Sequence, residues 1–83
     1  MRIHSAKELA LVVIGQRRRL KLSQTEVGQL VGLNQKTISA FENKPDSTEL
    51  ETLFRILSAV NFDMMIFDKN KMSAEEALWK EEW

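Results

Sequence analysis

Four polar side chains interrupt an apolar pattern in the middle of the chain. Between Leu33 and Ile38 the sequence reads Asn-Gln-Lys-Thr, from Asn34 to Thr37. An amide presents a donor and an acceptor side by side, a lysine adds positive charge, and a hydroxyl both donates and accepts. At the start of a short helix this set suits directional hydrogen bonding to a partner, so recognition is the chemistry that it indicates.

Residues suited to catalysis or metal binding are sparse by comparison. His4 is the single histidine and the chain has no cysteine, so a metal site would have to be built from carboxylates alone. The Asp and Glu residues have no nucleophile, phosphate-binding loop or buried basic partner close to them in sequence. The sequence therefore predicts a protein that is not an enzyme and that needs no metal or cofactor.

Length and charge indicate a small domain with partners. A chain of 83 residues with 43% hydrophobic content suffices for one domain, but buries a modest fraction of its surface and gains stability from association. The net charge of zero argues by itself against a general nucleic-acid binder. However, residues 1–44 hold eight Lys or Arg and three Asp or Glu, whereas residues 45–83 hold four and nine. This asymmetry is compatible with two different kinds of partner.

An apolar run near the N-terminus could be mistaken for the core of a signal peptide. The run from Leu9 to Ile14 is followed at once by Arg17, Arg18 and Arg19, and no small-residue cleavage site is present. The run is also far shorter than the roughly 20 residues that span a bilayer. Since the chain also lacks cysteines for disulfides, we expect a soluble, cytoplasmic protein.

Capping signals and a glycine divide residues 5–61 into four expected helices. Ser5 with Glu8 forms a capping box for a first helix that runs to about Leu20, and Ser23 with Glu26 forms a second box. The second helix ends at Gly32, and the turn that follows it is short. Two helices joined by such a turn indicate a helix-turn-helix unit.

The third and fourth helices follow from similar signals. Asn34 can cap a helix that reaches about Glu42 before Pro45, and Thr48 with Glu51 forms a box for the last helix. Apolar residues recur at helical spacing throughout. The residues expected on core-facing positions are Leu9, Val12, Val13, Leu20, Val27, Leu30, Val31, Ile38, Phe41, Leu50, Leu53, Phe54, Leu57 and Val60.

The periodicity changes after the fourth helix. Residues 61–68, NFDMMIFD, are rich in β-forming residues and alternate as a strand does. A lone strand leaves its backbone groups unpaired, and no other segment can complete the ladder. We therefore predict an all-α domain with one C-terminal strand, which pairs with a second copy in a two-stranded intermolecular sheet. The expected dimerisation residues are Phe62, Met64, Met65, Ile66 and Phe67.

Residues 69–83 are expected to form a flexible acidic tail outside the domain of residues 1–68. Lys, Asn, Ser and Glu dominate the tail, yet it contains Trp79 and Trp83. Tryptophan is among the side chains that most often dominate an interface. We predict that both tryptophans bind a protein partner; the alternative is that they fold back onto the domain.

The stretch from Gln24 to Glu42 resembles the helix-turn-helix of the phage-repressor family, also called Cro/C1 or XRE. The resemblance rests on a glutamine that opens the first helix, on Gly28 and Gly32, and on the apolar residues Ile38 and Phe41 of the second helix. A side chain larger than a methyl at Gly28 would push the two helices apart, and Gly32 supplies a turn conformation that other residues resist. The resemblance implies a repressor-like fold that binds double-stranded DNA.

In such a motif the start of the second helix meets base edges in the major groove. A glutamine amide can contact adenine in a bidentate manner, so Gln35 is the first candidate base reader and Lys36 the second. The resemblance implies that Gln24 bonds a phosphate and supports Gln35, and that Arg17 pairs with Glu42, while Arg18 and Arg19 are left open. The full set of candidate DNA-binding residues is Gln24, Asn34, Gln35, Lys36, Thr37, Ser39 and Lys44.

Beyond the motif, the chain is similar to the HipB antitoxin family. The similarity covers TISAFEN, then KPDSTELETLFRILSAV, a single strand and a tail that closes in Glu82-Trp83. It implies a homodimeric autorepressor that binds an inverted-repeat operator and neutralises a HipA-like kinase toxin. Two alternatives remain: a plain transcriptional repressor without a toxin partner, and a protein-interaction module that has lost DNA binding.

Overall fold

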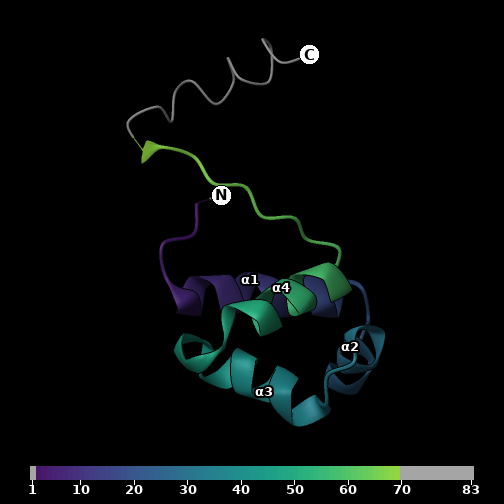
Figure 1. Cartoon of the computed structure of the whole chain (residues 1–83). Helices are drawn as coiled ribbons and strands as arrows, with labels where there is room; N and C mark the ends of the chain where they lie inside the picture. The colour runs from purple at the N-terminus through teal and green to yellow at the C-terminus, as the bar shows by residue number, and fades with distance from the viewer. Residues whose placement is uncertain (1, 70–83) are drawn as a thin grey trace.

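Four α-helices form the body of the protein. The computed structural model describes residues 2–69, and in this range the chain folds into α1 (Ala6–Arg19), α2 (Gln24–Val31), α3 (Gln35–Asn43) and α4 (Leu50–Ala59), with a short 3-10 helix, η1 (Pro45–Ser47), between the last two. In Figure 1, α3 runs along the lower side of the body, below α1 and α4, and α2 lies at one end. The expected four-helix architecture is confirmed.

The expected capping signals set three of the four helix starts. The Ser23 side chain accepts from the backbone N–H of Glu26 at 3.0 Å, and the Glu26 carboxylate accepts from the N–H of Ser23 at 2.8 Å. The side chains of Ser5 and Asn34 cap α1 and α3, but the box expected at Ser5 is not closed, because the Glu8 carboxylate accepts from the N–H of His4 and from the Ser5 hydroxyl. The box expected at Thr48 is wrong: α4 begins after Glu49, which makes no side-chain capping bond, because the turn of η1 places the helix start one residue later.

The core lies where the four helices meet. Its buried residues are Ala10, Val13, Val27, Ile38, Phe41, Leu53, Ile56, Leu57 and Val60. Several expected core residues are instead exposed, namely Leu20, Leu30, Leu50 and Phe54. The apolar residues of α4 span more of its circumference than the other helices cover, so Ile56 is buried and Phe54 faces outwards.

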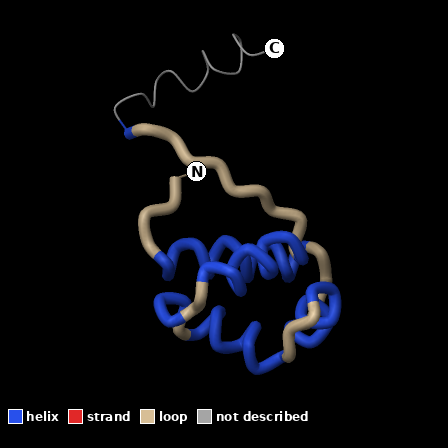
Figure 2. The backbone as a smooth tube through the Cα atoms, in the orientation of Figure 1, coloured by secondary structure: helices blue, strands red, loops and turns tan. Residues whose placement is uncertain are grey.

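Residues 62–68 lie outside the helices and form no strand within the single chain that the structure describes. The segment runs away from the helical body as a loop (Figures 1 and 2). Phe62 packs against the core of its own chain, whereas Met64, Met65 and Ile66 are exposed. A strand that pairs between two copies is not formed by one copy, so the intermolecular sheet stays a prediction.

Trp79 and Trp83 lie outside the described residues, as does nearly all of the expected tail. Among residues 2–69, no helix combines the length and apolar character needed to cross a membrane.

Candidate nucleic-acid interface

A close backbone approach fixes the turn between α2 and α3. The N–H of Leu33 donates to the carbonyl oxygen of Gly28 at 2.8 Å. A Cβ at Gly28 would overlap the carbonyl oxygen of Leu33, so even a methyl group is too large there, a stricter limit than the sequence suggested. Gly32 ends α2 in the left-handed region at φ 72°, which residues with a Cβ disfavour.

The recognition candidates lie on the exposed side of α3. Ile38 and Phe41 are buried in the core and fix the inner face of the helix. Gln35 and Lys36, in the first turn, are exposed. The packing of α3 therefore leaves its N-terminal turn open to a partner.

A chain of hydrogen bonds connects Gln35 to a nearly buried ion pair. The Arg17 guanidinium donates through Nε to Glu42 Oε2 at 2.6 Å and through Nη2 to Oε1 at 3.1 Å. Gln24 Nε2 donates to Glu42 Oε1 at 2.9 Å, and Gln35 Nε2 donates to Gln24 Oε1 at 2.6 Å. The expected pairing of Arg17 with Glu42 and the expected support of Gln35 by Gln24 are both present in the structure.

The remaining candidates differ in how much of their hydrogen-bonding capacity the fold itself uses. Asn34 Oδ1 accepts from both the N–H and the hydroxyl of Thr37, each at 2.9 Å, so these two residues serve the helix cap. The hydroxyl of Ser39 accepts from Asn43 Nδ2 at 3.1 Å. Lys44, at the end of α3, is exposed. Beside Gln35 and Lys36, this surface therefore also carries residues whose side chains form hydrogen bonds within α3 and its cap.

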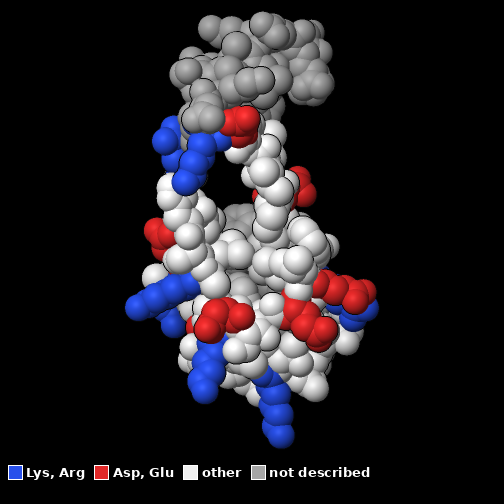
Figure 3. Space-filling view, turned by 60° about the vertical axis from the view of Figure 1, so that its left-hand side comes forward, with Lys and Arg blue, Asp and Glu red and all other residues white. Residues whose placement is uncertain are grey.

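Charge is distributed unevenly over the surface. Lys and Arg side chains project from the lower end of the molecule in Figure 3, the end at which α3 lies in Figure 1, while higher on this face acidic side chains are interspersed with other basic ones. Arg18 and Arg19 are exposed in the last turn of α1. The arrangement gives the α3 side a basic character suited to a polyanion.

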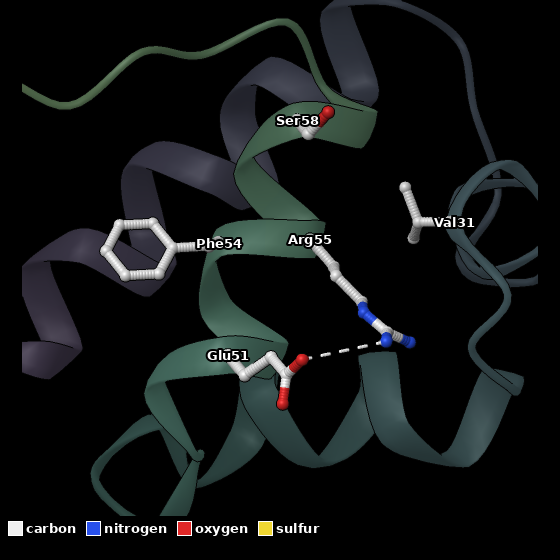
Figure 4. Close-up of a pocket in the computed structure, with 5 residues that line it drawn as sticks. All are labelled: Val31, Glu51, Phe54, Arg55 and Ser58. Carbon is white, nitrogen blue, oxygen red and sulfur yellow. Dashed lines mark ion pairs between the residues drawn. The ribbon is translucent and has the colours of Figure 1, made fainter.

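A shallow groove lies away from the candidate interface, between the end of α2 and α4. It is lined by Val31, Glu51, Phe54, Arg55 and Ser58, and Figure 4 shows Val31 facing α4 across it. Glu51 and Arg55 form a loose ion pair at 3.8 Å. None of the expected DNA-binding residues lines this groove.

Two side-chain contacts had no counterpart in the sequence analysis. Gln16 Nε2 donates to the carbonyl oxygen of Val60 at 3.0 Å and so joins α1 to the end of α4. Gln24 bonds Glu42, which sequence reasoning had paired with Arg17 alone. Both contacts join residues far apart in the chain, so no local pattern indicated them.

The packed α2–α3 pair, its glycine turn and its exposed first turn of α3 define a helix-turn-helix domain. A family model described as "Helix-turn-helix" matches residues 15–67. The chain is 37% identical over 76 residues to Antitoxin HipB of Escherichia coli O6:H1 (strain CFT073), which covers 92% of this chain and 81% of that protein. It belongs to the HipB antitoxin family of helix-turn-helix proteins.

Solved structures of HipB agree with this assignment. The chain matches a component of a structure described as a HipA-HipB-O2-O3 complex with a TM-score of 0.80 and 36% identity, over 83% of this chain and 97% of that one. It matches a HipB-O4 20mer complex equally well, with the same TM-score, identity and coverage. The likeness therefore extends from the motif to nearly the whole described fold.

Proposed function

We propose that this protein is an antitoxin and the transcriptional autorepressor of its own operon. It binds an inverted-repeat operator as a homodimer and holds a HipA-like kinase toxin inactive. The observation that carries the proposal is the exposed first turn of α3, where Gln35 is held by Gln24 in a chain whose relatives are found with HipA and with DNA.

In this proposal the side chains at the start of α3 read the operator in the major groove. Gln35 contacts an adenine, and Lys36 reaches a guanine or a phosphate. The other expected contacts position the protein on the DNA backbone and carry little sequence information. They are Gln24, Asn34, Thr37, Ser39 and Lys44.

The homodimer is supported by the apolar surface that one chain leaves uncovered. Phe54 of α4 and Met64 of the following segment line one groove, and Leu50, Met65 and Ile66 are exposed as well. Exposed apolar residues of this kind often become covered in protein interfaces. Pairing of residues 61–68 between two copies would cover it and satisfy the backbone groups of the segment.

The toxin partner is proposed to bind Trp79 and Trp83. The tail around them carries four glutamates against three lysines, and acids repel DNA phosphates, so a protein is the expected partner. A HipA-like kinase fits because the similar HipB chain is found in a complex with HipA.

Fluorescence anisotropy with DNA from the upstream region of the operon tests the DNA-binding part. We expect tight binding to this DNA, weak binding to a scrambled duplex, and a steep fall in affinity as salt rises, because phosphate contacts release counterions. Equal affinity for both duplexes at every salt concentration would contradict a repressor. No binding to either would favour the interaction module without DNA binding.

Co-expression with the neighbouring gene tests the antitoxin part. A kinase-like neighbour that co-purifies with the chain, and whose activity the chain suppresses, is the expected result. If the neighbour is not kinase-like and no complex forms, the protein is a plain repressor, because DNA binding alone does not require a toxin.

A further inference from the structure

In each of the hydrogen bonds that link Arg17, Glu42, Gln24 and Gln35, one atom can act only as the donor and the other only as the acceptor. The last of these residues, Gln35, lies on the exposed surface. We propose that Glu42, held by Arg17, is a positioning residue that sets the orientation of the Gln35 amide and thereby the base preference of the protein. This inference rests on the proposed base reading by Gln35. The new element is that the base preference of Gln35 is set by the carboxylate of Glu42, which is linked to Gln35 by two hydrogen bonds through Gln24.

The direction follows from the chemistry of the groups. A carboxylate only accepts hydrogen bonds, so the Gln24 amide must turn its NH₂ group to Glu42, as the bond of 2.9 Å from Gln24 Nε2 shows. Gln24 Oε1 then faces Gln35 and can only accept. Gln35 must therefore present Nε2 to Gln24, which it does at 2.6 Å.

The inner end of the chain is rigid enough to impose this direction. The side chains of Arg17 and Glu42 are 13% and 7% exposed, and two parallel bonds join them. A third bond from Arg17 Nη1 to the carbonyl oxygen of Leu22, at 3.0 Å, fixes the guanidinium to the backbone. The carboxylate has no donor to offer, and because Arg17 holds it in place, the constraint passes outwards through Gln24.

The orientation of the Gln35 side-chain amide decides where its donor and its acceptor lie when it meets a base. With Nε2 on the Gln24 side, the amide presents its donor nearer α2 and its acceptor farther away. A bidentate contact with adenine needs a donor opposite N7 and an acceptor opposite N6. Reversal of the amide would exchange the two positions while the backbone of α3 stayed in place, and the match to adenine would be lost.

The variant Glu42→Gln tests the proposal because an amide at this position can donate as well as accept. The matched control is Glu26→Gln, which removes the same charge from the same helix-turn-helix unit. A glutamine at position 26 still accepts the capping bond from Ser23. Both variants should therefore bind random DNA with similar affinity.

The first readout is the side-chain amide signal of Gln35 in nuclear magnetic resonance spectra of the free protein. In the wild type, one Gln35 NH₂ proton is hydrogen-bonded and should show a displaced resonance and slow exchange with solvent. We expect this signature to be lost in Glu42→Gln and kept in Glu26→Gln. An unchanged Gln35 signal in a folded Glu42→Gln protein would overturn the proposal.

The second readout is base selection from a library of randomised operators. Gln35→Ala identifies the base pair that Gln35 reads, as the position whose preference disappears. At this base pair Glu42→Gln should lower the preference for adenine by about tenfold, within the range of one bidentate contact, and should have no further effect in the Gln35→Ala background. An unchanged adenine preference would overturn the proposal.

A second variant keeps the test decisive if Glu42→Gln fails to fold. Gln24→Ala cuts the chain without altering the pair of Arg17 with Glu42, so it should produce the same two changes in a stable protein; wild-type behaviour would overturn the inference. If Gln35→Ala alters no base preference, the proposed base reading is wrong, and the amide spectra alone then decide whether Glu42 orients Gln35.

Discussion

At the scale of single residues, burial separates two ion pairs of the same chemical type. Arg17 and Glu42 are joined by two hydrogen bonds at side-chain exposures of 13% and 7%, whereas Arg55 and Glu51 approach to 3.8 Å at exposures of 50% and 84%. Removal of one partner from a shielded pair leaves a charge without compensation, while an exposed pair contributes little. The two pairs should therefore respond differently to the same substitution.

Arg17→Met should lower the free energy of unfolding by about 3 kcal/mol, because Glu42 would be left in a shielded site without its cation. Arg55→Met is the matched control and should cost less than about 1 kcal/mol. Urea denaturation followed by circular dichroism measures both. Equal losses for the two variants would show that burial does not distinguish the pairs.

Gln35→Ala should cost about 1–3 kcal/mol of binding free energy on the cognate operator and little on random DNA, because base contacts specify and phosphate contacts only position. Gln24→Ala removes the support of Gln35 together with a proposed phosphate contact, so its loss should be less selective. Anisotropy titrations on the two DNAs give the comparison. A loss from Gln35→Ala that is the same on both would exclude base reading.

At the scale of elements, the tight turn between α2 and α3 places the recognition candidates. The N–H of Leu33 bonds the carbonyl oxygen of Gly28, and this contact sets how closely α3 approaches α2. A displacement of α3 would also move Gln35 away from Gln24, which it contacts at 2.6 Å. Packing at the turn and geometry at the site are therefore coupled.

Gly28→Ala should destabilise the fold by about 1–3 kcal/mol, because the new methyl group overlaps the carbonyl oxygen of Leu33 and the helices must move. Gly15→Ala is the control in α1, where nothing lies within 4 Å of the added Cβ. It should stabilise by about 0.5–1 kcal/mol through helix propensity. Thermal unfolding of both variants gives opposite shifts if this account is correct; two shifts of the same sign would refute it.

At the scale of the whole molecule, the described residues keep apolar surface that the proposed second copy would cover. The helical body is closed around its own core, but the apolar residues Phe54, Met64 and Ile66 remain exposed. The basic side of the molecule at α3 faces away from the segment that leaves α4 (Figures 1 and 3). The proposed DNA-binding side and the proposed dimerisation segment therefore do not overlap.

Met65→Pro should weaken self-association, because proline removes a donor from the proposed strand ladder. Met65→Val keeps the N–H and the strand propensity, and serves as the control. Met65 is exposed and lies outside the helices, so neither change should unfold the body. Sedimentation at low protein concentration checks this: a Met65→Pro protein that remains as dimeric as the control would contradict strand pairing.

Deletion of residues 71–83 should weaken toxin binding and leave dimerisation and DNA affinity nearly unchanged. The double variant Trp79→Ala, Trp83→Ala should reproduce much of the loss, since tryptophans often dominate interfaces. Calorimetry with the purified toxin measures the affinity of each protein. If deletion lowers thermal stability by several kcal/mol without toxin, or leaves toxin affinity unaltered, the tail belongs to the fold and not to the interface.

The sequence by itself determined the number and order of the helices, because the signals for them are local. Ser5, Ser23 and Asn34 cap the helices that follow them, and Gly32 ends α2, as their positions predicted. Capping and turn conformation depend on neighbours within about four residues. The resemblance to the phage-repressor motif made Gln35 the first candidate base reader, and Gln35 lies in the first turn of α3 as that motif requires.

Only the tertiary structure decided which apolar residues are buried and how the site is held. Phe54 satisfied the helical period as well as Ile56 does, but the crossing of α4 over the other helices buries Ile56 and exposes Phe54. The bond from Gln24 to Glu42 spans 18 residues and no sequence signal indicated it, while the pair of Arg17 with Glu42 spans 25 residues and was implied by the family resemblance alone. Such contacts exist only once α1, α2 and α3 pack together, because their geometry depends on the relative placement of helices and not on any local pattern.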